Sequence, residues 1–292
     1  MFSKKLLMFL IAFLGVVFAA SVCFGSSGDI EWPGCCSDDP VCDEPPCEPC
    51  DDCDDFTKEF PLQECRYFKT IGKNLYFKLI PGYKLVLESD EEKAEITVLW
   101  ETKKIRVPGV GKINTRVVEE RAYEWDEDDD EWVTIEISLN WFAICKKTNA
   151  VYYFGEWSRD CEDGFDENDQ CEDESNAGSW EAGVDGAMPG LIMPATFVLG
   201  AKYCQEQAPS EDSEEAAVDR GENVKMGVNV KSPAGKFKNC VMVVDTNPAE
   251  GVCDPDDGDE KIYCPDVGLV QDGDLELVEY GYEDYPPWCR YR

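Results

Sequence analysis

Residues 132–144 read Trp-Val-Thr-Ile-Glu-Ile-Ser-Leu-Asn-Trp-Phe-Ala-Ile, and this stretch decides the fold class. Apolar residues at every second position share one side of an extended chain: Val133, Ile135, Ile137, Leu139, Trp141 and Ala143. Polar residues share the other side: Thr134, Glu136, Ser138 and Asn140. A side-chain period of two is typical of a half-buried β-strand.

The same alternation, or a short β-prone run, recurs along the chain. The predicted strands are Tyr83 to Glu88, Ala94 to Glu101, Asn114 to Trp125, Trp132 to Ile144, Val151 to Glu156, Lys202 to Gln207, Val224 to Val230, Phe237 to Thr246, Lys261 to Cys264 and Leu275 to Tyr280. No window after Phe60 shows an apolar stripe of helical period between helix caps. We therefore expect an all-β protein of about ten strands, a curved antiparallel sheet that forms an open barrel or a sandwich. Residues 126–131 and Pro233-Ala234-Gly235 are the expected hairpin tips.

The N-terminus has the pattern of a secretory signal peptide over residues 1–25. Lys4 and Lys5 precede an apolar run from Leu6 to Ala20, and small residues follow. The run is shorter than the roughly 20 residues that span a bilayer, which disfavours a retained anchor. Lipidation of Cys23 is a further alternative, disfavoured by the branched Val22 before it. We expect export to the periplasm or the extracellular space, with no membrane span after cleavage.

Composition divides the remaining chain into three parts. Residues 26–59 are rich in Cys, Pro and Asp and poor in aliphatic side chains, so only cross-links can order them. Residues 60–281 carry the predicted strands. Residues 282–292 form an aromatic tail, which is expected to pack on the sheet or to dock on another subunit.

Sixteen cysteines in an exported chain predict disulfides, because the compartments beyond the inner membrane are oxidising. The candidates are Cys35, Cys36, Cys42, Cys47, Cys50, Cys53, Cys65, Cys145, Cys161, Cys171, Cys204, Cys240, Cys253, Cys264 and Cys289. The spacing Cys47-x2-Cys50-x2-Cys53 also occurs in thiolate metal sites and iron–sulfur clusters. A disulfide knot is favoured because no second CxxC accompanies it.

Charge excludes several functions. The chain has 27 Lys and Arg against 62 Asp and Glu, a formal charge of −35, and no histidine. A polyanion repels phosphate backbones, so we expect no nucleic-acid partner; a cationic protein partner fits instead. Without histidine, every Ser-His, Cys-His and His-metal mechanism is excluded. Glycoside hydrolysis by two carboxyl groups needs no histidine, but 62 acids single out no pair. We expect a protein without enzymatic activity.

Two acidic loops are candidate calcium sites, because Ca²⁺ takes six to eight oxygen ligands. The candidate ligands are Asp254, Asp256, Asp257, Asp259 and Glu260 in one loop, and Asp160, Glu162, Asp163, Asp166 and Asn168 in the other. Neither loop has the EF-hand spacing. Cysteines bracket both loops, Cys253 with Cys264 and Cys161 with Cys171, and a disulfide across each would pre-assemble its carboxylates. The alternative is that these loops only add solubilising charge.

A third candidate site is an apolar segment broken by Pro and Gly. Its large side chains are Met188, Leu191, Ile192, Met193 and Phe197. Such a segment fits a lid over the open face of a curved sheet, where methionine adapts to varied ligands. A lipid-like ligand would then occupy the sheet's concave face. The alternative is a loop that plugs one end of the core.

Two motifs resemble a known kind of domain. Residues 232–240, Ser-Pro-Ala-Gly-Lys-Phe-Lys-Asn-Cys, and residues 263–270, Tyr-Cys-Pro-Asp-Val-Gly-Leu-Val, resemble the signatures TPAGxFxxC and YxPxVGLV. These occur in exported bacterial β-rich domains of uncharacterised function, which are distantly similar to LolA-like carriers of lipid or lipoprotein. The resemblance covers about Leu75 to Gly281 and implies a curved antiparallel sheet in the envelope or outside the cell. It supplies no catalytic residues.

Together these observations predict an exported, disulfide-stapled, non-enzymatic binding or structural protein whose acidic loops bind calcium weakly. A carrier of lipid-like apolar molecules is the first alternative, and a subunit of an extracellular assembly or filament is the second.

Calcium binding by the two loops predicts that a chelator lowers the melting temperature of the purified protein. Ligand that binds only the folded state stabilises it, so added calcium should restore the transition. A melting temperature that stays constant over the whole calcium titration would contradict the calcium prediction.

Overall fold

A computed structural model describes residues 55–65, 67–127, 130–210 and 216–282. The described residues form β-strands, with two short 3-10 helices, η2 (Leu62–Cys65) and η4 (Pro248–Glu250), and no α-helix. The all-β prediction is therefore confirmed. The predicted signal peptide, the cysteines from Cys35 to Cys53 and the tail with Cys289 lie outside the described residues.

The strands run β1 (Phe68–Lys69), β2 (Gly72–Lys73), β3 (Lys78–Leu79), β4 (Tyr83–Glu88), β5 (Glu92–Val107), β6 (Gly111–Asp126), β7 (Glu131–Cys145), β8 (Val151–Asp160), β9 (Trp180–Glu181), β10 (Gly190–Met193), β11 (Lys202–Cys204), β12 (Arg220–Ser232), β13 (Gly235–Thr246), β14 (Asp259–Cys264), β15 (Gly268–Asp272) and β16 (Leu275–Tyr282). Each of the ten predicted strands overlaps one of them. The six that were not predicted have two to five residues each, too few for alternation to stand out.

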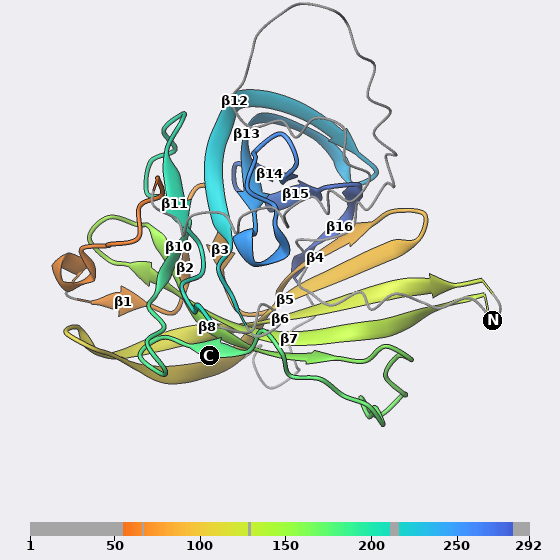
Figure 1. Ribbon diagram of the computed structural model, residues 1–292. Helices are drawn as coiled ribbons and strands as arrows, with labels where there is room; N and C mark the ends of the chain where they lie inside the picture. Colours follow the sequence, from red (N-terminus) through yellow and green to blue (C-terminus); the bar gives the residue numbers. More distant parts are fainter. Residues whose placement is uncertain (1–54, 66, 128–129, 211–215, 283–292) are drawn as a thin grey trace, which may run out of the picture.

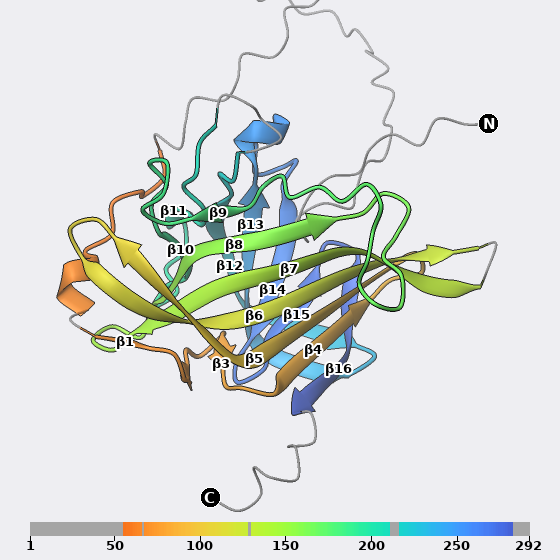
Figure 2. The same ribbon diagram turned by 90° about the horizontal axis from the view of Figure 1, so that it is seen from below.

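One antiparallel sheet contains 14 of these strands. Twelve follow the order β10-β8-β7-β6-β5-β4-β16-β15-β14-β13-β12-β11, and the short strands β1 and β9 pair with β7 and β8. The sheet folds over, so that β12 to β15 lie opposite β5 to β8 in both views (Figure 1 and Figure 2). The main hydrophobic core lies between the two layers and includes Leu87, Val98, Phe154, Val241 and Leu277.

The two ends of the sheet meet without a strand pairing that closes it. The amide of Met188 donates to the carbonyl of Gln207 at 2.9 Å, and Gln207 Nε2 donates to the carbonyl of Pro189 at 2.7 Å. Gly190 at the start of β10 lies so close to the carbonyl of Gln205 that a side chain at this position would collide with it. The architecture is therefore an open barrel, as expected.

A buried arginine supports the sharpest irregularity in the sheet. The pairing of β5 with β6 shifts register between Val98 and Thr102, which frees carbonyl groups in β5 from the ladder. The Arg116 side chain, which is buried in β6, donates to the carbonyls of Leu99, Trp100 and Glu101 at 3.3, 2.6 and 3.0 Å. Buried carbonyls need such partners, so Arg116 makes the bulge tolerable.

Strand β7 is buried on both of its faces, which differs from the half-buried strand that its alternation predicts. Glu136, Ser138 and Asn140 on its polar side are all buried. Ile137 on the other side packs against Cys161 and Phe165 of an acidic loop that covers this part of the sheet. The alternation correctly predicted which side chains share a face of β7. It wrongly predicted that the polar face is exposed to solvent, because the sequence of one strand does not show that its polar side chains face a polar interior.

Three disulfides join described cysteines: Cys65 with Cys145, Cys161 with Cys171, and Cys240 with Cys264. The expected closure of one loop by Cys253 and Cys264 is wrong, because Cys240 lies directly across from Cys264 on the neighbouring strand, with their Cα atoms 4.2 Å apart. Cys253 is disulfide-bonded outside these three pairs, and Cys204 is buried at the end of β11. These disulfides fit a protein of an oxidising, exported compartment.

The long-range disulfide between Cys65 and Cys145 should stabilise the fold more than the local one between Cys161 and Cys171. The sequence separations are 80 and 10 residues, and closing the longer loop removes more entropy from the unfolded chain. We expect the Cys65→Ala/Cys145→Ala variant to lose about 2 kcal/mol more than the Cys161→Ala/Cys171→Ala variant. Urea unfolding of both variants measures the difference, and equal losses would contradict it.

Candidate functional site

A cavity of about 130 Å³ lies between the two layers of the sheet. One part of its lining is apolar and aromatic, contributed by both layers and by the strands that connect them: Phe77, Tyr83, Leu85, Ile96, Val98, Val118, Phe142, Ile192, Val267 and Leu269. Tyr83 is held in place by its hydroxyl group, which donates to the carbonyl of Val267 at 2.7 Å. The cavity therefore has a rigid apolar wall.

The other part of the lining is polar and includes four acids: Lys78, Glu120, Asn140, Tyr153, Gln205, Glu206, Asp219, Lys261, Tyr263 and Asp272. Glu120 and Asn140 come from β6 and β7, and Lys261 and Asp272 from β14 and β15 of the opposite layer. Four carboxyl groups thus share one small interior space. Such a concentration is costly, because burial disfavours the ionised form of each group.

Lys261 compensates part of this acidic charge. Its Nζ lies 3.0 Å from Asp245 Oδ2 and 3.7 Å from Asp272 Oδ2, and all three side chains are largely buried. Burial lowers the pKa of Lys261, but Asp272 and Asp245 outweigh this effect and raise it above its ordinary value. The lysine is therefore charged and is engaged with two carboxylates.

Glu206 and Asp219 are neighbouring carboxyl groups of the lining, and burial outweighs the groups that favour their ionised forms: Trp180 and Lys261 for Glu206, and Lys261 and Arg220 for Asp219. Their residues are 3% and 6% exposed. The backbone holds them side by side, because the amide of Glu206 donates to the carbonyl of Asp219 at 3.1 Å. Glu206 Oε2 and Asp219 Oδ1 are buried without a hydrogen-bond partner in the described part of the chain. Burial, and then the charge of Asp219, raises the pKa of Glu206 well above its ordinary value.

Tyr153 links the cavity to a deeper acid, Glu156. The Tyr153 hydroxyl group contacts Asn140 Oδ1 and lies 2.8 Å from Glu156 Oε2. A phenol has only one proton, so a protonated Glu156 can donate to the tyrosine while the tyrosine donates to Asn140. Burial, and then the charge of Glu206, raises the pKa of Glu156 well above its usual range. The arrangement thus favours a neutral Glu156.

Two of the candidate calcium ligands, Asp254 and Asp166, stabilise turns in their own loops. Asp254 Oδ1 accepts a hydrogen bond from the amide of Asp256, and Asp166 Oδ1 accepts from the amides of Asn168 and Gln170. Asp160 is the last residue of β8, and burial followed by the charge of Glu174 raises its pKa to about 6. The other candidates are exposed or partly buried: Asp257, Asp259, Glu260, Glu162 and Asp163.

No group of three carboxylate or thiolate side chains converges as around a metal ion, within the residues that the structure describes. The calcium prediction therefore has no geometric support in the described loops and stays a prediction.

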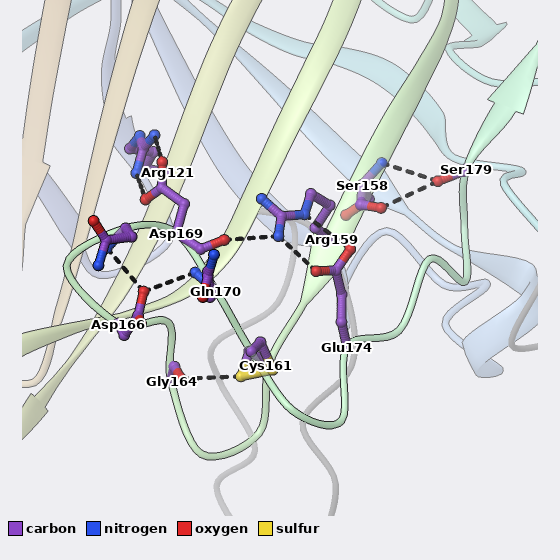
Figure 3. Close-up of polar contacts among 12 residues, drawn as sticks. Arg121, Ser158, Arg159, Cys161, Gly164, Asp166, Asp169, Gln170, Glu174 and Ser179 are labelled. Atoms are coloured by element: carbon purple, nitrogen blue, oxygen red, sulfur yellow. Dashed lines mark hydrogen bonds and ion pairs between the residues drawn. A yellow bond between two sulfur atoms is a disulfide. The ribbon is translucent and has the colours of Figure 1, made fainter.

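The acidic loop that follows β8 is fastened to the sheet by two arginines (Figure 3). Arg121 Nη1 and Nη2 donate to the two carboxylate oxygens of Asp169 at 2.8 and 2.9 Å. Arg159 Nε donates to Glu174 Oε1 at 2.8 Å, and Arg159 Nη2 donates to the carbonyl of Asp169, also at 2.8 Å. Together with the Cys161–Cys171 disulfide, these contacts hold the loop over the outer face of β7.

The predicted lid is part of the sheet. Residues 190–193 form β10, which pairs with β8. Of the five predicted lid residues, Ile192 lines the cavity, Met193 is fully buried, and Phe197 packs edge-on against Tyr76. Met188 is exposed and Leu191 is partly buried, and neither is among the cavity-lining residues. Of the five predicted residues, the structure thus places only Ile192 at the cavity.

The acidic residues of the cavity were not predicted from the sequence. Glu120 and Glu206 lie within predicted strands, Asp272 ends β15, which was not predicted, and Asp219 directly precedes β12. The chain has 62 acidic residues, and residue type alone does not distinguish a buried carboxyl group from one on the surface. One feature of the sequence was consistent with a polar interior. Asn140, Ser138 and Glu136 share one face of a strand whose other face is strongly apolar.

No protein-family model, no curated protein and no solved structure matches this chain. The described residues contain no helix with the length and apolar character needed to span a membrane.

The buried acids predict that stability falls as the pH rises. Burial is the main cause that raises the pKa of Glu120, Asp219 and Asp272 to about 7. In the unfolded chain these groups titrate near 4, so between about pH 4 and pH 7 the folded state binds more protons. The melting temperature should therefore decline over this interval and level off above it.

The Asp219→Asn variant should show a shallower decline between pH 4 and pH 7 than the wild type. Asp256→Asn is the matched control, since this aspartate is exposed and its neutralisation changes the net charge equally. Thermal unfolding followed by circular dichroism at each pH measures both. A decline as steep in Asp219→Asn as in the control would contradict the assignment.

Proposed function

We propose that the protein is a non-enzymatic carrier that binds a small, largely apolar molecule in the cavity between its sheet layers. The observation that carries this proposal is the preformed cavity with its apolar wall from both layers. Binding sites for small molecules are concave, mostly apolar and equipped with a few polar groups. The mouths and interiors of β-barrels are common places for them.

The volume of the cavity sets the size of the ligand. A cavity of about 150 Å³ with apolar walls holds one benzene molecule in an engineered protein. The cavity here is slightly smaller, about 130 Å³. A single ring or a chain of about six carbon atoms therefore fits, and a complete lipid does not. The cavity volume therefore restricts the proposed lipid-like ligand to a molecule of about this size.

Two further observations support a carrier in an exported compartment. The disulfides are formed independently of any ligand: Cys65–Cys145 ties η2 to the end of β7, and Cys240–Cys264 ties β13 to β14. The resemblance of residues 232–240 and 263–270 to exported domains similar to LolA-like carriers favours the same function.

Binding of 1-hexanol tests the proposal, because the alcohol is neutral and matches the cavity in size. Isothermal titration calorimetry should show saturable binding to the wild type. Val118→Trp in β6 and Leu269→Trp in β15 fill the cavity from opposite layers and should each abolish binding. Val198→Trp is the control, since Val198 is 57% exposed and lies outside the cavity.

Circular dichroism establishes that each tryptophan variant folds, and two variants are used because inserting a large side chain into a core costs about 1–3 kcal/mol. If the wild type binds neither hexanol nor a charged analogue of the same length, or if hexanol binds the folded cavity variants as well as Val198→Trp, the proposed function is wrong.

A further inference from the structure

We propose that the ligand of this cavity carries a positively charged amino group, which contacts the partnerless oxygens of Glu206 and Asp219 while its apolar body lies against the aliphatic and aromatic wall. This inference rests on the proposed function and adds the chemical class of the ligand: a small organic ammonium ion.

The cavity lining contains more acidic than basic side chains. Four carboxyl groups line the cavity: Glu120, Glu206, Asp219 and Asp272. Among the lining cations, Lys261 is engaged with Asp272 and with Asp245 behind it, and the Lys78 ammonium lies over the ring of Tyr83, 4.1 Å from its centroid. Lys261 lowers the pKa values of Glu120, Glu206 and Asp219, and Arg220 lowers that of Asp219, but at each of the three groups burial outweighs these cations. The interior thus carries more acid than its own cations compensate.

Among the described residues, two of the lining acids also have hydrogen-bond acceptors without a donor. Glu206 Oε2 and Asp219 Oδ1 have no partner in the described part of the chain, although both residues are more than nine-tenths buried and line the cavity. Leaving a buried acceptor without a donor costs roughly 1–3 kcal/mol, and more when the group is charged. An ammonium group has three donors and one positive charge, so it satisfies both oxygens and compensates the acidic charge in a single contact.

Other ligand classes fit the lining less well. A metal ion needs several converging oxygens, and no such group of three occurs among the described residues. A neutral hydroxyl group donates one hydrogen bond and leaves the excess charge uncompensated. An anion would meet four carboxyl groups. The apolar wall disfavours a fully polar cation, so the ligand combines a short hydrocarbon or aromatic body with an amine.

The same carboxyl groups make binding depend on pH. An ammonium ion binds the ionised acids more tightly, and the groups titrate within an accessible range because burial raises their pKa values. The titratable groups that line the cavity are Lys78, Tyr83, Glu120, Tyr153, Glu206, Asp219, Lys261, Tyr263 and Asp272. Behind them, Glu136, Glu156, Arg220, Asp245, Glu250 and Asp259 also act on these groups.

The experiment compares three probes of equal length, hexylammonium, 1-hexanol and hexanoate, by calorimetric titration of the full protein at pH 8 and pH 5.5. At pH 8 hexylammonium should bind at least about tenfold more tightly than hexanol, and hexanoate should bind most weakly. At pH 5.5 the advantage of hexylammonium should shrink, because the probe keeps its charge while the carboxyl groups take up protons.

Glu206→Gln and Asp219→Asn should each remove most of the preference for hexylammonium and leave hexanol binding unchanged. Glu92→Gln is the matched control: burial raises the pKa of Glu92 to about 7 as well, but this residue does not line the cavity. The wild-type comparison at two pH values does not depend on whether the variants fold.

The outcomes separate the two proposals. If hexanol binds as tightly as hexylammonium at pH 8, or the preference persists in both folded variants, the ammonium inference is overturned and the carrier function stands. If none of the three probes binds, the carrier function itself is overturned.

Discussion

Burying carboxyl groups away from water is the constraint on which the interior of this protein depends. Each ionised group loses hydration, and repulsion between neighbours adds to the cost. The structure meets this constraint by pairing Lys261 with Asp245 and Asp272 and by raising the pKa values of the remaining acids. These solutions are incomplete, since one carboxylate oxygen of Glu206 and one of Asp219 have no hydrogen-bond partner among the residues that the structure describes. Incomplete compensation in a preformed cavity is a feature of binding sites more than of structural cores.

The sheet that encloses these acids has to curve. A sheet of 14 strands has to bend to bring its layers face to face, and it bends where the ladder shifts register. The bulge in β5 leaves carbonyl groups inside the fold, and Arg116 supplies the donors that they need. The Cys65–Cys145 disulfide then ties the chain before the sheet to the end of β7. Local polarity and cross-links, as well as apolar burial, determine this curvature.

Prediction from the sequence succeeded where a pattern extends over many residues. Strands such as β7 and β13 follow from alternation, and the tips at residues 126–131 and 233–235 follow from turn residues. Prediction failed where the position of a residue depends on residues far away in the sequence. The pairing of Cys264 with Cys240 follows from the register of β13 against β14, which loop length alone does not contain. The acids of the cavity come from four separate segments, and only the folded sheet brings them together.

The meeting of β10 and β11 at the two ends of the sheet has a consequence for association with other chains. Exposed strand edges are templates for adding further strands, and natural sheets protect them against edge-to-edge aggregation. Here the contacts of Met188 and Pro189 with Gln207 use part of each edge internally. A filament built by strand addition at these edges would first have to separate them. Any polymer of this protein is therefore more easily built through side chains on its faces than by extending its backbone ladder.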